Sequence, residues 1–175
     1  MKYLYLSLSI SLLLAGPIRD NSEQHIFSQF TEDIQINMYT YKITSEIKKE
    51  VQNEAKQSFY RDKLYYWNIS KNDTTIAYAF LDNVKGKSMP ITFLVIINKQ
   101  GKIINTAVIK YREAYGGQVG QKKWLEQFNN YNNNSNYKIG DEIDGITGAT
   151  ISVNSLSRGI QKITILFSLI KNTLK

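Results

Sequence analysis

Four segments typical of β-strands, joined by short links, constrain the fold of this chain more than any other feature. The segments span residues 64–69, 75–81, 90–98 and 102–111. They are rich in β-branched and aromatic residues, which favour strands. Only residues 99–101 separate the last two segments, which is the length of a hairpin link. Because a parallel pair needs a crossover of about a dozen residues or more, we expect an antiparallel sheet.

Two amphipathic helices are predicted to pack against this sheet. The first has Thr44 or Ser45 as its cap and an apolar residue at every fourth position: Ile43, Ile47, Val51, Ala55 and Phe59. The second covers about residues 152–174 and carries apolar side chains at helical spacing: Leu156, Ile160, Ile163, Phe167, Ile170 and Leu174. The expected fold class is therefore α+β, a small antiparallel β-sheet packed against helices with a C-terminal helix.

Between the last strand and the C-terminal helix, the sequence predicts one short helix and one polar loop. The helix covers residues 121–128 and presents Trp124, Leu125 and Phe128 on one face. The Asn-rich residues 129–137 form the loop, to which we assign no function. With 175 residues, of which 42% are hydrophobic, the chain has enough apolar side chains for one core. We therefore expect a single domain over residues 21–175.

The first 20 residues resemble a secretory signal peptide. Lys2 precedes an apolar run from Tyr3 to Gly16, and Pro17 and polar residues follow. The run is shorter than the ~20 apolar residues of a comfortable membrane span. An uncleaved membrane anchor is the alternative, and a buried N-terminal helix is a third. The first two readings place the folded part outside the cytoplasm, in the periplasm or the cell envelope.

The residues that are missing exclude several kinds of chemistry. The chain has no cysteine, and its single histidine, His25, is expected to precede the folded part. Haem attachment, iron–sulfur clusters, Cys/His zinc sites and Ser-His-Asp nucleophiles are therefore excluded. A hard-metal site made of carboxylates stays open, but the sequence has no spaced Asp/Glu loop, and no metal site is predicted. Any redox cofactor should be organic. The net charge of +7 suits an anionic membrane or an acidic partner, but the lysines are scattered, which argues against nucleic acid.

The stretch DGITGAT, from Asp144 to Thr150, directly precedes the predicted C-terminal helix. Its glycines and hydroxyl side chains are consistent with an ordinary helix cap. Thr150, however, falls just before or within the first turn, where free N–H groups and the helix dipole favour an anion. A phosphate esterified to Thr150 would be stabilised at this position.

Two other glycine-containing stretches are rejected as nucleotide-binding motifs. The sequence Gly86-Lys87-Ser88 resembles the end of a P-loop, but Leu81 occupies the required earlier glycine position. The glycines at 116, 117 and 120 lack the first glycine of a dinucleotide fingerprint and its strand–helix–strand unit.

DGITGAT resembles the flavinylation motif Asp-x-x-Ser/Thr-Gly-Ala-Thr/Ser of the FMN-binding domain family. This family includes the C subunit of the sodium-pumping NADH:quinone oxidoreductase and the G subunit of the Rnf complex. Upstream, the strands and the YREAYGGQ stretch at 111–118 are similar in order and spacing to the family's strand, strand, YRE-x-x-GG and helix block. The resemblance covers roughly residues 77–169. Ala114 departs from the Pro or Ser that is common at its position.

This resemblance implies an exported electron carrier with covalent FMN, rather than a self-contained enzyme. A separate Mg-dependent flavin transferase would move FMN from FAD onto the hydroxyl of Thr150, which gives a phosphoester link. The motif positions that the transferase reads are Asp144, Thr147, Gly148 and Ala149. The family's cofactor-side loop corresponds here to Arg112, Tyr115, Gly116 and Gly117. The electron donor and acceptor, in the membrane or outside the cytoplasm, are not specified by the sequence.

Two rival functions belong to different classes. One is an extracytoplasmic binding or scaffold module that keeps the fold but carries no flavin. The other is a self-contained flavin reductase, for which the sequence offers no dinucleotide signature. For five side chains, packing in the protein and contact with the cofactor are both open: Tyr111, Arg112, Tyr115, Trp124 and Phe128.

Overall fold

A five-stranded antiparallel sheet forms the centre of the protein in the computed structural model, which describes residues 16–31 and 33–175. The strands lie in chain order, so that each pairs with its neighbours in sequence. Their bounds are β1 Gln35–Lys42, β2 Lys63–Lys71, β3 Thr74–Lys85, β4 Pro90–Asn98 and β5 Ile103–Lys110. This arrangement confirms the predicted antiparallel sheet.

Three of the connections between strands are tight turns. Asn72 and Asp73 link β2 to β3 with φ of 47° and 59°, the left-handed backbone that two-residue hairpins require. Gly101, with φ of 88°, closes the turn between β4 and β5, as the short link predicted. Residues 86–89 connect β3 to β4. Because all these links are short, the sheet is a simple meander.

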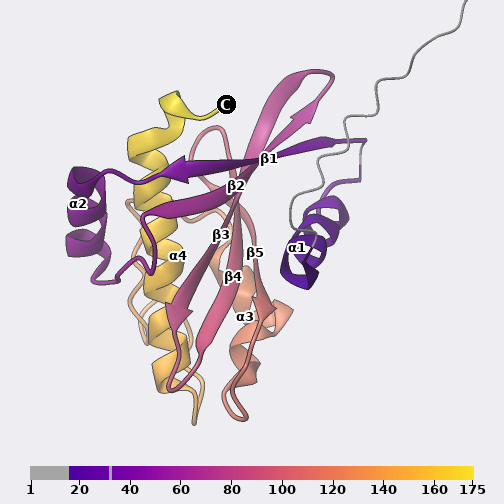
Figure 1. Ribbon diagram of the computed structural model, residues 1–175. Coiled ribbons are helices and arrows are strands. Elements are labelled where there is room, and N and C mark those ends of the chain that lie inside the picture. Colours follow the sequence, from indigo (N-terminus) through magenta and orange to yellow (C-terminus); the bar gives the residue numbers. More distant parts are fainter. Residues whose placement is uncertain (1–15, 32) are drawn as a thin grey trace, which may run out of the picture.

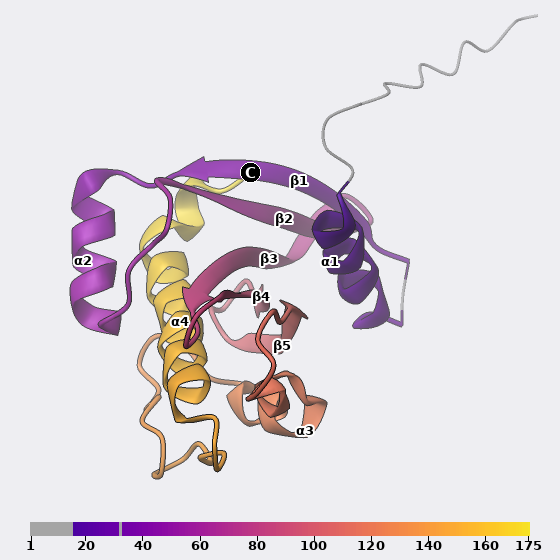
Figure 2. The same cartoon turned by 60° about the horizontal axis from the view of Figure 1, so that its bottom comes forward.

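Helices cover both faces of the sheet (Figures 1 and 2). The long helix α4 and the neighbouring α2 lie on one face, and α1 lies on the other. The α-helices are α1 Pro17–Ser28, α2 Ser45–Ala55, α3 Lys122–Leu125 and α4 Thr150–Ile170, and the 3₁₀ turns are η1 Gly117–Gly120, η2 Glu126–Phe128 and η3 Lys171–Thr173. Thr44 caps α2, as expected, since its Oγ1 accepts from the N–H of Ile47 at 3.4 Å. No described helix is long and apolar enough to cross a membrane.

The main core lies between the sheet and α4. Alternate residues of β4 point to this core, among them Phe93 and Val95, while Leu94 and Ile96 belong to the smaller cluster beneath α1. Near the middle of α4 the helix lies very close to the sheet. A Cβ atom on Gly159 would be 2.4 Å from Cγ1 of Val84. The absence of a side chain at Gly159 therefore sets the distance between α4 and β3.

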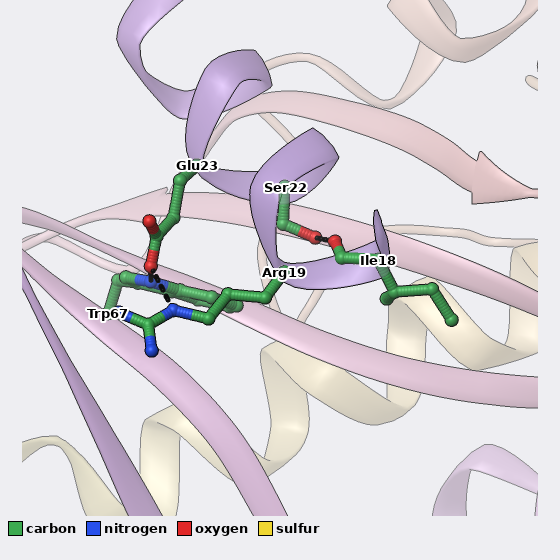
Figure 3. A network of polar contacts seen from close by, with 5 residues as sticks. All are labelled: Ile18, Arg19, Ser22, Glu23 and Trp67. Carbon is green, nitrogen blue, oxygen red and sulfur yellow. Dashed lines mark hydrogen bonds and ion pairs between the residues drawn. The ribbon is translucent and has the colours of Figure 1, made fainter. Parts of the chain in front are cut away.

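The first helix, α1, is anchored on the opposite face by buried and polar contacts. Ile26 is fully buried there. Glu23 joins two partners: its Oε1 accepts from Nε1 of Trp67 at 3.0 Å and lies 2.7 Å from Nε of Arg19 (Figure 3). His25 lies 2.7 Å, through Nε2, from Oδ1 of Asn105. The prediction that His25 precedes the folded part is therefore wrong.

Neither α1 nor β1 was predicted from the sequence, and both lie in the stretch expected to be polar. The apolar residues of α1 are too few to give a clear helical stripe, so its position depends on contacts with the sheet. The predicted N-terminal segment, 1–20, falls mostly outside the described residues. Its last four residues, 17–20, form the first turn of α1.

A buried ion pair joins α4 to the sheet. Nζ of Lys162 lies 2.8 Å from Oδ2 of Asp82. The same ammonium donates to the carbonyl of Ser58 at 2.8 Å and lies 4.4 Å from the ring centre of Phe59. Burial raises the pKa of Asp82 and lowers the pKa of Lys162, because both charged forms lose their water. Removal of either partner alone would therefore leave an uncompensated charged group in the core.

Candidate functional site

Three segments that are distant in sequence meet at one end of the sheet and line a cavity of about 730 Å³. They are residues 87–89 in the β3–β4 turn, residues 112–116 after β5, and residues 148–152 at the start of α4. In Figure 1 the β3–β4 turn and the start of α4 lie together at the lower end of the molecule. The cavity is large enough for a flavin-sized ligand.

The start of α4 is suited to binding an anion. Thr150 is its first residue and is exposed to solvent. Ala149 occupies the cap position, where no side chain forms a capping hydrogen bond, and the first turn contains no acidic residue. The first N–H groups of a helix have no partner within the helix, and the dipole adds positive potential. Because the helix start is not capped by Asp144, Thr147 or Thr150, the cap alternative loses its main support.

Gly148 sets the geometry of the turn before α4. Its φ is +78°, a left-handed conformation that residues with a side chain rarely adopt, and a Cβ there would meet no atom within 4 Å. The glycine is therefore needed for its backbone and also leaves open space in front of Thr150. Ala149 is buried, and its carbonyl accepts the first helical hydrogen bond, from Val153 at 2.9 Å.

The rest of the motif is held from behind by α3 and η2. The carbonyl of Asp144 accepts from Nε1 of Trp124 at 2.8 Å, and the N–H of Asp144 donates to Oε1 of Gln127 at 2.9 Å. The Asp144 carboxylate itself is exposed. Trp124 and Phe128 are buried, so both belong to the core, and Trp124 also fixes the motif backbone. Thr147 lines a smaller adjoining cavity of about 360 Å³.

Exposure of the Asp144 carboxylate leads to a prediction that separates recognition from folding. Asp144→Ala should reduce covalent flavin loading several-fold but change the melting temperature little, because surface substitutions usually alter stability by about 0.5 kcal/mol or less. Gly148→Val should also reduce loading, with a strain cost of about 1–3 kcal/mol from its left-handed backbone.

Quantitative flavin absorbance after denaturation, together with thermal melting, measures both effects. Asp141→Ala is the matched control, since Asp141 is an exposed carboxylate in the same loop but outside the motif. Proportional losses of loading and stability in Asp144→Ala would instead assign a structural role to Asp144.

Three consecutive residues, Tyr111, Arg112 and Glu113, connect the cavity walls. The hydroxyl of Tyr111 donates to the carbonyl of Tyr115 at 2.6 Å and lies 3.0 Å from Oγ of Ser152 in α4. Since the single phenolic proton is used on the carbonyl, Ser152 is the donor in the second contact. These bonds tie the loop after β5 to the first turn of α4.

The other two residues of this triplet fix the loop to the β3–β4 hairpin. Arg112 donates through Nη1 to the carbonyl of Pro90 at 2.8 Å and to Oγ1 of Thr92 at 3.0 Å. Glu113 accepts through Oε1 from the N–H groups of Ser88 at 2.6 Å and Met89 at 3.0 Å. These backbone donors lower the pKa of Glu113 below its ordinary value. Arg112, predicted as a cation for the cofactor, therefore also has a structural role.

The glycines and the tyrosine of this loop differ in their surroundings. Gly116 has φ of +84°, and a Cβ there would lie 2.7 Å from the Tyr111 hydroxyl, so only glycine fits. At Gly117 a Cβ would make ordinary contact with the Tyr111 ring, at 3.7 Å. Tyr115 is 85% exposed and borders both cavities. Its ring is therefore available to a ligand.

This exposure makes Tyr115 a suitable position for testing contact between the loop and the flavin. If Thr150 carries the flavin, as the motif predicts, we expect Tyr115→Ala and Gly117→Val to load like the wild type, because neither residue belongs to that motif. Loss of a stacking contact worth about 1 kcal/mol should shift the flavin midpoint potential and change its fluorescence. Potentiometry and emission spectra of the loaded proteins measure this. Unchanged values in both variants would make the loop a purely structural turn.

Sequence reasoning missed several residues that line the cavity. They are Lys87, Ser88, Met89, Glu113, Ile151 and Ser152. The signal for the first three was present, because Gly86-Lys87-Ser88 lies between two predicted strands and therefore had to be a hairpin turn. The sequence could not show that this turn faces Thr150.

Comparison with known families agrees with this geometry. The FMN-binding domain family matches residues 86–164, a span that contains all three cavity-lining segments. No curated protein matches the sequence significantly. The matched span supports flavin binding and electron transfer. Residues 86–164 therefore match the FMN-binding domain family, as the DGITGAT and YREAYGGQ motifs predicted.

Proposed function

We propose that the protein is an extracytoplasmic electron carrier whose FMN is joined through a phosphoester to Thr150. One observation carries this proposal: the Thr150 side chain is exposed at the start of a 21-residue helix that has no side-chain cap, on the wall of the 730 Å³ cavity. A phosphate on this hydroxyl would lie beside the free N–H groups of the first turn. Gly148 leaves room for it.

The cavity walls also fit the flavin ring. Three apolar side chains around Thr150 are exposed, Met89 by 45%, Tyr115 by 85% and Ile151 by 51%. Exposed apolar side chains that gather around one cavity are typical of a ligand site. FMN held there would accept and release one or two electrons. The protein would supply binding, orientation and the surrounding charge.

An external flavin transferase is needed to form the link. Threonine is a weak nucleophile without an adjacent base. The only histidine, His25, belongs to α1, which lies on the other face of the sheet from α4. In the proposed reaction, the Thr150 oxygen attacks the FMN phosphorus of FAD, AMP leaves, and the hydroxyl proton passes to a base of the Mg-dependent transferase. Asp144, Thr147, Gly148 and Ala149 are the positions that this enzyme would read.

The N-terminal segment determines the proposed location. The apolar run in residues 1–20 would export the chain or hold it at the membrane. The electron donor and acceptor would then be membrane-bound or extracytoplasmic proteins.

Intact mass spectrometry of protein coexpressed with a competent transferase tests this function. We expect an added mass of one FMN less one water, and peptide mapping should place it on Thr150. Protein that stays colourless would favour the scaffold function. NADH oxidation by the purified protein alone would favour the self-contained reductase.

A further inference from the structure

The turn between β3 and β4 spans residues 86–89, and its residues 87–89 form one wall of the cavity. This turn is not a P-loop, because a strand and not a helix follows it. The structure instead places Lys87, Ser88 and Met89 on the same cavity as Thr150. This turn thus has no role in the function proposed above beyond the apolar contact of Met89.

The turn is held by several hydrogen bonds. The N–H of Gly86 donates to the carbonyl of Met89 at 3.0 Å, and the Glu113 carboxylate accepts from the N–H groups of Ser88 and Met89. A Cβ on Gly86 would lie 2.6 Å from Glu113 Oε1 and 2.7 Å from the Met89 carbonyl, so the turn packs tightly on the carboxylate. The residues on both sides of Lys87, Gly86 and Ser88, therefore take part in the contacts that hold the turn.

Three charged side chains line the cavity: Lys87, Arg112 and Glu113. Two of them form hydrogen bonds that connect the loop after β5 to the β3–β4 hairpin. Arg112 binds the β4 edge and Glu113 binds the turn. Lys87 is exposed, and in the described part of the chain no acceptor forms a hydrogen bond or ion pair with its ammonium. Its charge nevertheless acts on Glu113, whose pKa it helps to lower. Lys87 is thus the cation that the site leaves available for a ligand.

We propose that Lys87 raises the reduction potential of the flavin carried by Thr150. This inference rests on the proposed function. Taking up two electrons and one proton leaves one additional negative charge on the flavin ring, so a cation at the cavity wall stabilises the reduced form more than the oxidised form. The electrons come from the protein's electron donor in the cell, and from dithionite in a reductive titration. The positive charge of Lys87 acts through space, so its effect is screened by salt.

Lys87→Met tests this role, with the covalently loaded full-length protein as the starting point. We expect the equilibrium constant for two-electron reduction to fall about tenfold, which corresponds to about 30 mV. Lys87→Arg keeps the charge and should stay close to the wild type. Lys85→Met is the matched control, because Lys85 is an exposed lysine at the end of β3, two residues away and outside the cavity lining. The difference between Lys87→Met and the wild type should shrink in 1 M salt.

The outcomes distinguish this inference from the function on which it rests. Wild-type protein that takes up no flavin overturns both. Loaded Lys87→Met protein with the wild-type potential, or an equal shift in Lys85→Met, overturns the role of Lys87 alone. Loss of loading in Lys87→Met would assign the lysine to attachment and would likewise overturn the proposal.

Discussion

Thr150→Ala is expected to fold normally and to carry no covalent flavin after denaturing precipitation. The substitution removes the only oxygen to which the proposed phosphoester can form, while an alanine at the first position of a helix is well tolerated. Because the Thr150 side chain is exposed and does not cap the helix, the melting temperature should change little. Absorbance of the precipitated protein and its intact mass measure the loss.

Two variants control for this loss. Thr150→Ser keeps a hydroxyl at the same place and should still be loaded. Thr147→Ala removes the other threonine of the motif, which lies on the smaller cavity, and should keep part of the flavin. Yellow denatured Thr150→Ala protein would overturn the assignment of the attachment residue.

The largest expected effect on stability comes from Lys162→Met, which breaks the buried ion pair with Asp82. The variant leaves a buried carboxylate without its cation, and such losses cost about 3–5 kcal/mol. For a chain of this size the melting temperature should fall by roughly 10 °C or more. Thermal and urea unfolding at pH 7 measure the change.

A double variant and a pH series separate the effect of the unpaired Asp82 carboxylate from the effect of lost packing. Asp82→Leu combined with Lys162→Met replaces both charges with apolar groups and should recover most of the stability. In the single variant, burial raises the pKa of the isolated Asp82 further above its ordinary value of 3.8. A raised acid pKa contributes stability that is present at low pH and lost as pH rises, so the deficit relative to wild type should narrow as pH falls from 7 towards 4. A deficit that is constant with pH would contradict this explanation.

Local sequence alone determined much of the fold and the identity of the motif. The strands β2 to β5 followed from runs of β-branched and aromatic residues with short links between them. The helices α2 and α4 followed from apolar residues at helical spacing, and Thr150 was placed at the start of α4 by the same spacing. These features depend on neighbouring residues in the chain, which is why a single sequence is enough to reveal them.

Only the tertiary structure decided what surrounds Thr150 and what covers the second face of the sheet. Lys87 and Glu113 are 26 residues apart and meet the start of α4 only because the meander brings the turns to one end. In α1, Glu23 and His25 find their partners on β2 and β5, so a weakly amphipathic segment becomes a docked helix. Contacts between residues distant in sequence leave no periodic pattern in the chain. Their loop-closure entropy and their stabilising energy arise only when the sheet forms and brings the residues together.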